Sequence, residues 1–128
     1  MTRVLIVDDQ PAFRRVLSQL LSQAGLDVIG EARDISEAEA LVRANPPDLA
    51  VIDVMLPDIS GLEGTPRLKA LLPDLRVILI SAYLNHAGIF QSVAREAGAE
   101  AFVSKDKLDL DVVRMWSSKG GDGFKGDA

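Results

Sequence analysis

The sequence predicts an α/β fold in which helices cover both faces of a doubly wound parallel sheet. Strand-like apolar runs alternate with helix-like segments along the 128 residues, which is the pattern of βαβ units. The strand-like runs are uninterrupted and largely aliphatic, as expected for parallel strands that are buried on both faces. With 48% apolar residues, the chain is long enough for a single domain with one core.

Four of the five strand-like runs end in a residue that phosphoryl chemistry can use. These runs and their polar ends are Val4–Val7 with Asp8 and Asp9, Leu49–Ile52 with Asp53, Val77–Ile80 with Ser81, and Ala101–Ser104 with Lys105. In open parallel sheets the carboxyl ends of the strands lie along one edge, where these folds bind their ligands. We therefore expect three carboxylates, a hydroxyl and an ammonium to converge on one crevice.

The remaining run has Val28–Ile29 as its short core and is expected at the edge of the sheet. It ends in Gly30, Glu31 and Ala32, which do not match the other polar ends. In the strand order 2-1-3-4-5 this strand lies away from the crevice between the first and third strands. A strand in that position need not contribute to the site.

Start and stop signals between the strands predict five helices. Pro11 occupies the first turn of the first helix, Gly25 ends that helix, and Asp34 with Glu37 forms a capping box for the second. The predicted helices are Pro11 to Ala24, a segment from Asp34 to Asn45, Pro66 to Leu72, His86 to Ala97, and about Asp106 to Ser118.

Two of these helices carry apolar faces of interest. The fourth is expected to bury Phe90, Val93, Ala94 and Ala97. The fifth carries more apolar residues than one narrow buried stripe needs, namely Leu108, Leu110, Val112, Val113, Met115 and Trp116. We therefore expect some apolar side chains of the fifth helix to be exposed and available to a partner.

The domain is expected to span residues 1–118, and residues 119–128 are expected to form a flexible tail or the start of a linker. Four of the chain's 10 glycines lie in this tail, a density that resists regular structure.

Composition excludes several classes of protein. The chain has no cysteine, which rules out disulfides and thiolate metal sites and suits a cytoplasmic location. It has 14 basic and 19 acidic residues, a net charge of −5, so we expect no direct binding to nucleic acid. It shows neither a signal-peptide pattern nor an apolar run of membrane-spanning length, so we expect no membrane partner.

The polar strand ends suit a divalent metal and a phosphoryl group. Three neighbouring carboxylates repel one another unless a cation neutralises them, and Mg²⁺ takes few carboxylates while bridging to phosphate oxygens. Asp53 stands singly after a central strand and is the best candidate nucleophile, whereas Asp8 and Asp9 are paired like metal ligands. Lys105 and Ser81 can hold phosphoryl oxygens. Each residue alone has an ordinary interpretation as a cap or a solvated side chain, but their recurrence at successive strand ends favours a site.

Five motifs of the chain resemble those of the response-regulator receiver domain of two-component signalling. They are Val7-Asp8-Asp9, Ile52-Asp53-Val54-Met55-Leu56-Pro57, Gly61-Leu62-Glu63, Ile80-Ser81-Ala82 and Ser104-Lys105. They follow one another in the family's order and spacing, and the resemblance runs from Met1 to about Ser118. It implies a flavodoxin-like (βα)₅ fold.

The resemblance also implies a phosphorylation chemistry. Asp53 would accept a phosphoryl group from the phosphohistidine of a sensor histidine kinase or a phosphotransfer protein. Asp9, Asp53 and the backbone carbonyl of Met55 would hold Mg²⁺, with Asp8 assisting through water. The chain would be a phosphoacceptor that assists its own phosphorylation and dephosphorylation rather than an enzyme.

A conformational switch is the last implication of the resemblance. Ser81 and Lys105 would bind the phosphoryl oxygens, and Phe102 occupies the family's aromatic switch position, although a plain core phenylalanine is an equal alternative. The change would alter the face made by the fourth helix, the fifth strand and the fifth helix, through which the chain could bind an output partner or form a homodimer.

The sequence departs from the family pattern in two places. Lys105 is followed by Asp106 instead of proline, a variant associated with receivers that carry a helix-turn-helix output domain. The stretch Gly64-Thr65-Pro66 is unusual for the start of the third helix. The chain is therefore either a standalone regulator or the receiver of a longer transcription regulator.

Two other classes of function compete with this interpretation. A haloacid-dehalogenase-type phosphatase also uses a strand-end aspartate with Mg²⁺, but Met55 stands where that family has a second carboxylate, and the chain has no room for a cap domain. A receiver-like binding module that works without phosphorylation would not need the complete set of polar strand ends.

Overall fold

The computed structural model describes residues 1–82 and 87–117, without the side chains of residues 87–90. The predicted tail at 119–128, the domain boundary at 118, the helix start at His86 and the burial of Phe90 lie outside the described residues.

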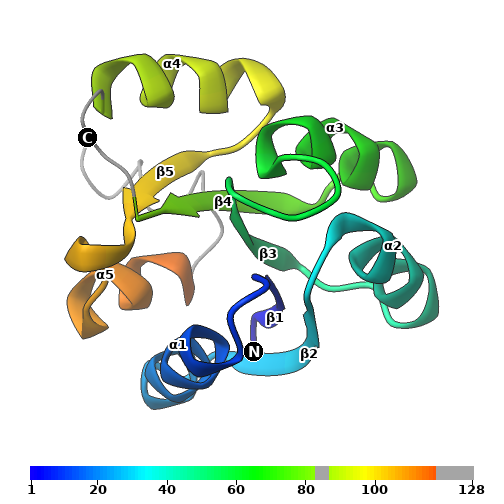
Figure 1. Ribbon diagram of the computed structural model, residues 1–128. Helices are drawn as coiled ribbons and strands as arrows, with labels where there is room; N and C mark the ends of the chain where they lie inside the picture. Colours follow the sequence, from blue (N-terminus) through cyan, green and yellow to red (C-terminus); the bar gives the residue numbers. More distant parts are fainter. Residues whose placement is uncertain (83–86, 118–128) are drawn as a thin grey trace.

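The sheet has five parallel strands in the order β2-β1-β3-β4-β5 (Figure 1). In chain order they are β1 (Arg3–Val7), β2 (Asp27–Ala32), β3 (Leu49–Asp53), β4 (Arg76–Ser81) and β5 (Ala101–Ser104). The predicted α/β class and the strand order 2-1-3-4-5 are confirmed.

Helices cover both faces of this sheet, with α1 and α5 on one side and α2, α3 and α4 on the other (Figure 1). The helices are α1 (Pro11–Gln23), α2 (Ile35–Ala44), α3 (Gly61–Leu71), α4 (Ala87–Ala97) and α5 (Leu110–Arg114). Short 3₁₀ turns lie at Lys105–Lys107 and Met115–Ser117. The predicted cap of α2 is confirmed, because the Asp34 carboxylate accepts a hydrogen bond from the Glu37 N–H at 2.8 Å.

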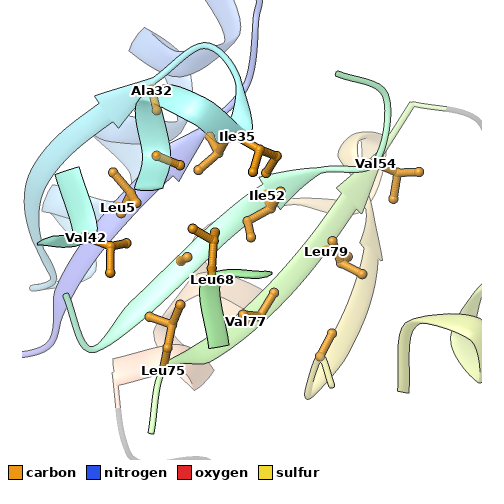
Figure 2. Packing of buried hydrophobic residues seen from close by; sticks show 14 of the residues in the cluster. Leu5, Ala32, Ile35, Val42, Ile52, Val54, Leu68, Leu75, Val77 and Leu79 are labelled. Atoms are coloured by element: carbon orange, nitrogen blue, oxygen red, sulfur yellow. The ribbon is translucent and has the colours of Figure 1, made fainter. Parts of the chain in front are cut away.

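The two faces of the sheet carry separate apolar clusters, which explains the uninterrupted aliphatic runs. In β1, Leu5 and Val7 face the cluster under α2, α3 and α4, whereas Val4 and Ile6 face the cluster under α1 and α5. Figure 2 shows the first cluster, in which Leu68 of α3 packs among strand residues. Every residue of β3 is buried, so the polar residue that ends it is held on a rigid central strand.

The start of α3 differs from the prediction, which placed it near Pro66. The helix begins at Gly61, because the Ser60 hydroxyl caps it by accepting a hydrogen bond from the Glu63 N–H at 3.1 Å. Pro66 lies inside the helix, where Thr65 donates its hydroxyl proton to the Gly61 carbonyl at 2.7 Å. Because Thr65-Pro66 resembles a cap followed by a first-turn proline, the predicted start of α3 was five residues too late.

Two glycines let α3 approach its neighbours closely. A Cβ on Gly61 would lie 2.4 Å from the backbone oxygen of Asp53, so only glycine allows the helix start to rest on the end of β3. A Cβ on Gly64 would lie 2.3 Å from Cδ1 of Ile35 in α2. The unusual residue at 64 is therefore explained by helix packing.

The C-terminal helix is shorter than predicted. In place of one helix from Asp106 to Ser118, α5 runs for only five residues between two 3₁₀ turns, and Asp109 caps it by accepting from the Val112 N–H. Val113 and Trp116 are buried, and Leu108 and Val112 pack against the same cluster. The broad apolar face mostly packs on the sheet, and Met115 is the residue in it that is strongly exposed, at 71%.

The apolar stripe of α4 is also narrower than predicted. Ala94 is buried, but Val93 is 38% exposed and Ala97 is only partly buried.

Among the described residues, no helix has the length and apolar character that crossing a membrane requires.

We predict that Gly64→Ala lowers the free energy of unfolding by about 1–3 kcal/mol, because the added methyl group overpacks the contact with Ile35. Chemical denaturation measures this loss. Gly30→Ala is the control, since a Cβ there would meet Leu5 and Leu41 at ordinary contact distances of 3.5 and 3.6 Å.

A double-mutant cycle with Ile35→Ala tests the cause of this loss. If the contact is responsible, Gly64→Ala costs less when Ile35 is already truncated. Equal costs in both backgrounds would contradict the packing explanation.

Candidate functional site

The register of the sheet brings four strand ends to one edge. Val7 of β1 pairs with Ile52 of β3, Asp53 with Ile80 of β4, and Ser81 with Ser104 of β5. The residues that follow β1 and β5, and those that end β3 and β4, therefore lie along the same edge, as the sequence predicted.

Three carboxylates cluster at this edge. Oxygen atoms of Asp8, Asp9 and Asp53 lie within 4.8 Å of one another. Asp8 and Asp53 are buried, at 0% and 4% exposure, whereas Asp9 is exposed. Two of the three acidic groups have thus lost most of their hydration, which makes compensation by positive charge necessary.

Lys105 supplies positive charge to both buried carboxylates. Its Nζ lies 2.7 Å from Oδ2 of Asp8 and 3.0 Å from Oδ2 of Asp53, and its side chain is only 12% exposed. Burial lowers the pKa of Lys105, but the close contacts of its ammonium with the carboxylates of Asp8 and Asp53, and their charges, outweigh this effect and raise the pKa above its ordinary value. Lys105 is therefore charged at neutral pH.

The same ammonium lies over an aromatic ring. Nζ of Lys105 is 4.1 Å from the centre of the Phe13 ring in α1, a cation–π contact in a poorly hydrated place. Phe13 also packs against the apolar cluster under α1 and α5. Its contact with Lys105 has no local sequence signal, because 92 positions separate the two residues.

The Asp8 carboxylate is fixed on one side and available on the other. Oδ1 accepts a hydrogen bond from the Gln10 N–H at 2.8 Å, and the Asp8 N–H donates to the Ala32 carbonyl at 2.9 Å. Oδ2 lies at ion-pair distance from Lys105, but the direction of approach is not that of a hydrogen bond, so this fully buried oxygen has no hydrogen-bond donor among the described residues. Oδ2 is therefore ion-paired with Lys105 and can still accept a further cation.

Asp53 combines burial with two hydrogen bonds. Its Oδ1 accepts from the Met55 N–H at 3.0 Å and its Oδ2 from Lys105 at 3.0 Å. Burial raises the pKa of Asp53 to about 6 and the Asp8 charge adds to this, although the Met55 N–H and Lys105 act in the opposite direction. At neutral pH Asp53 is therefore a largely ionised and poorly hydrated carboxylate, the form that a nucleophile requires.

The cluster fits a small divalent cation. Within the residues that the structure describes, three carboxylates face one ammonium and Oδ2 of Asp8 lacks a hydrogen-bond donor, so the site can accept a further positive charge. Mg²⁺ binds through one or two carboxylates and keeps several of its waters. Because Asp9 is exposed to solvent, its side of the cluster leaves room for these waters. The donor set contains oxygen ligands only, as a hard cation prefers.

The remaining predicted residues lie around this cluster. Ser81 is buried at the end of β4, and the Met55 side chain is 58% exposed while its backbone N–H holds Asp53. Phe102 is 4% exposed and packs in the cluster under α2, α3 and α4, and its carbonyl accepts from the Gln91 side chain of α4 at 2.9 Å. Their roles in phosphoryl binding, metal binding and switching stay predictions.

The second strand supports the site from behind without adding a side chain to the acidic cluster. The Ala32 carbonyl, at the end of β2, binds the N–H of Asp8, and Glu31 pairs with Arg14 at 3.1 Å. Arg14 also donates to the Asp8 carbonyl at 2.5 Å. The edge strand therefore supports the loop that carries the acidic pair, although its own side chains do not enter the cluster.

Comparisons with known proteins agree with this geometry. The response regulator receiver domain family matches residues 4–114. The chemotaxis protein CheY of Thermotoga maritima is 31% identical over 103 residues, which are 80% of this chain and 84% of that protein. A crystal structure of a LuxR-family two-component response regulator from Aurantimonas sp. is 29% identical with a TM-score of 0.85, over 95% of this chain and 86% of that one.

Several relatives are longer than this chain. The DNA-binding transcriptional activator DevR/DosR of Mycobacterium tuberculosis is 39% identical over 115 residues, which are 89% of this chain but 52% of that protein. The chain thus spans about half the length of the first curated relatives that it matches.

We predict that Asp53→Asn stabilises the metal-free protein at about pH 8 but not at about pH 4, as measured by denaturation in a chelator. The folded pKa of Asp53, about 6, lies above its unfolded value of 3.8, so its contribution to stability is present below the unfolded pKa and is lost as pH rises through the folded pKa. The expected gain at pH 8 is about 1–3 kcal/mol.

The control for this prediction is Asp111→Asn, because the Asp111 side chain is 91% exposed. Its effect should be small and the same at both pH values. If Asp53→Asn also shows no pH dependence, then burial does not shift the titration of Asp53 as described.

Proposed function

This chain belongs to the response regulator receiver domain family, and we propose that it is a phosphorylation-controlled signalling domain in which Asp53 is the phosphoacceptor. The observation that carries the proposal is the Lys105 ammonium 3.0 Å from Oδ2 of Asp53, beside two further carboxylates. This arrangement holds a nucleophile, a positive charge for phosphoryl oxygens and acidic ligands for a metal within one cluster.

The reaction we propose is transfer from a phosphohistidine of a sensor histidine kinase or a phosphotransfer protein. A carboxylate oxygen of Asp53 attacks the phosphorus, the N–P bond breaks, and the electron pair of that bond stays on the departing imidazole. The product is an acyl phosphate on Asp53. The burial of Asp53 supports this role, because the carboxylate loses little hydration when it attacks.

The proposed metal ligands are Asp9, Asp53 and the backbone carbonyl of Met55, with Asp8 assisting through water. Mg²⁺ at these oxygens would neutralise charge that builds up on the transferring phosphoryl group. Asp8 and Asp9 hold the negative potential that attracts the ion, and Gln10 fixes the Asp8 carboxylate.

Lys105 and Ser81 are the proposed partners of the phosphoryl oxygens. Lys105 already lies next to the acceptor oxygen, so a short movement of a flexible side chain carries its ammonium from the carboxylate to the new phosphoryl group. Ser81 ends the neighbouring strand and offers a hydroxyl to another oxygen. Phe102 would respond to that movement from within the core.

The proposed output acts through the face formed by α4, β5 and α5, towards a partner, a second copy of the chain or a further domain. Gln91 links α4 to the backbone of β5 at Phe102, and Val93 and Met115 expose apolar surface. Control of transcription is the output that we favour, since the relative DevR/DosR is a DNA-binding activator and extends well beyond the matched region.

We predict that acetyl phosphate with Mg²⁺ adds one phosphoryl group to the protein, detected by intact-mass spectrometry, and that Asp53→Asn abolishes the addition. The reason is that no amide nitrogen or oxygen replaces the carboxylate nucleophile. Asp58→Asn, a change at an exposed aspartate in the loop after β3, serves as the matched control and should be labelled like the wild type.

Two results would contradict the proposal. Full labelling of Asp53→Asn would move the acceptor elsewhere, and labelling that proceeds equally well in excess chelator would remove the metal from the reaction.

A further inference from the structure

Arg14 connects the loop that carries the acidic pair to the edge of the sheet. Its Nη1 donates to the backbone carbonyl of Asp8 at 2.5 Å, and its Nε donates to Glu31 of β2 at 3.1 Å. The Arg14 side chain is 19% exposed and extends from the first turn of α1, where its own N–H donates to the Gln10 carbonyl. One guanidinium thus joins α1, the loop after β1 and strand β2.

We propose that Arg14, held by Glu31, is a positioning residue that orients Asp9 and so sets the affinity of the acidic cluster for Mg²⁺. This inference rests on the proposed function, because it assumes that the cluster binds the ion. Arg14 is not expected to touch the metal or the phosphoryl group.

The contact of Arg14 falls on the peptide that determines where Asp9 points. The carbonyl of Asp8 and the N–H of Asp9 belong to one planar peptide unit, so fixing the carbonyl also fixes the direction in which the backbone enters Asp9. The Asp8 carboxylate has anchors of its own in Gln10 and Lys105. The Asp9 carboxylate is exposed and makes no hydrogen bond or ion pair within the described residues, so its placement depends on this backbone.

Glu31 neutralises the positive charge of Arg14, which allows an arginine to position the backbone next to a cation site. An unpaired guanidinium beside the cluster would repel Mg²⁺, whereas the pair of Arg14 and Glu31 is neutral. Because the pair is partly exposed, at 19% and 41%, it adds little to stability as an ion pair. The hydrogen bond from Arg14 to the Asp8 carbonyl is therefore the contact that we expect to affect Mg²⁺ binding.

Magnesium makes such positioning matter more than a larger ion would. Mg²⁺ requires nearly ideal octahedral geometry at short distances, so a ligand that is displaced or disordered loses much of its contribution. A residue that orders Asp9 before the ion arrives raises the affinity without contacting the ion.

The test is the dissociation constant of Mg²⁺, measured by isothermal titration calorimetry on the unphosphorylated protein, for the double variant Arg14→Met with Glu31→Gln. Removing both charges leaves the local net charge unchanged, so a change in Mg²⁺ affinity would reflect the orientation of Asp9 and not a change in charge. We expect Mg²⁺ to bind about tenfold more weakly than to the wild type, which is the lower end of the loss that follows mutation of residues supporting a metal ligand.

Arg76 with Glu100 provides a matched control. Arg76 also donates to a glutamate, at 2.9 Å, and to a backbone carbonyl, that of Trp116, at 3.1 Å, with a side chain 16% exposed. Arg76 is the first residue of β4, so it lies at the amino ends of the strands, whereas the cluster lies at their carboxyl ends. The variant Arg76→Met with Glu100→Gln should change the melting temperature but leave the Mg²⁺ dissociation constant within twofold.

A third variant, Arg14→Lys, keeps the charge but cannot reproduce the planar fork, and should bind Mg²⁺ with intermediate affinity. It decides the question if the double variant does not fold. Unchanged or tighter binding after loss of Arg14, or an equal loss in the Arg76 control, overturns the inference. If the wild type itself binds no Mg²⁺, the proposed function fails, and the inference fails with it.

Discussion

Two buried carboxylates, those of Asp8 and Asp53, share the ammonium of Lys105, and most properties of the site follow from this ratio of two carboxylates to one ammonium within the described part of the chain. The ammonium lies within ion-pair distance of both groups, yet Oδ2 of Asp8 has no hydrogen-bond donor among the residues that the structure describes. Burial still raises the pKa of Asp53 to about 6, so its ionised form is held at a cost in stability. A metal ion or a phosphoryl group that enters this site therefore changes the balance between the negative charge of the carboxylates and the positive charge of Lys105.

The fold holds these charged groups close together because it places the rigid ends of neighbouring strands side by side. Parallel strands that are buried on both faces hold Asp53 and Ser81 on backbones that cannot relax towards solvent. The close seat of Gly61 on the backbone of Asp53 fixes the loop between β3 and α3, whose Met55 N–H binds the acceptor carboxylate. Supporting contacts come from neighbouring elements, such as Phe13 above Lys105 and Ala32 behind Asp8.

The sequence was sufficient for the sheet and for the residues at its edge, because buried strands and polar strand ends are local patterns. It was misleading where two local signals competed, as at Ser60 and Thr65-Pro66, and the cap that forms in the structure is the one at Ser60. It was silent on Phe13 and Arg14, since a contact between distant segments leaves no periodic signal. The apolar residues near Trp116 could be counted from the sequence, but their burial depended on how the short α5 lies against the sheet.

Lys105 acts as the internal counter-ion of the two buried carboxylates, and the stability of Lys105→Met at about pH 8 tests this role. Without metal, this change leaves Asp8 and Asp53 facing each other and should lower the free energy of unfolding by about 3 kcal/mol, a loss typical of breaking a buried pair. Saturating Mg²⁺ should recover much of the loss by supplying charge to the same oxygens. A loss of the same size with and without Mg²⁺, or no loss at all, would contradict the account.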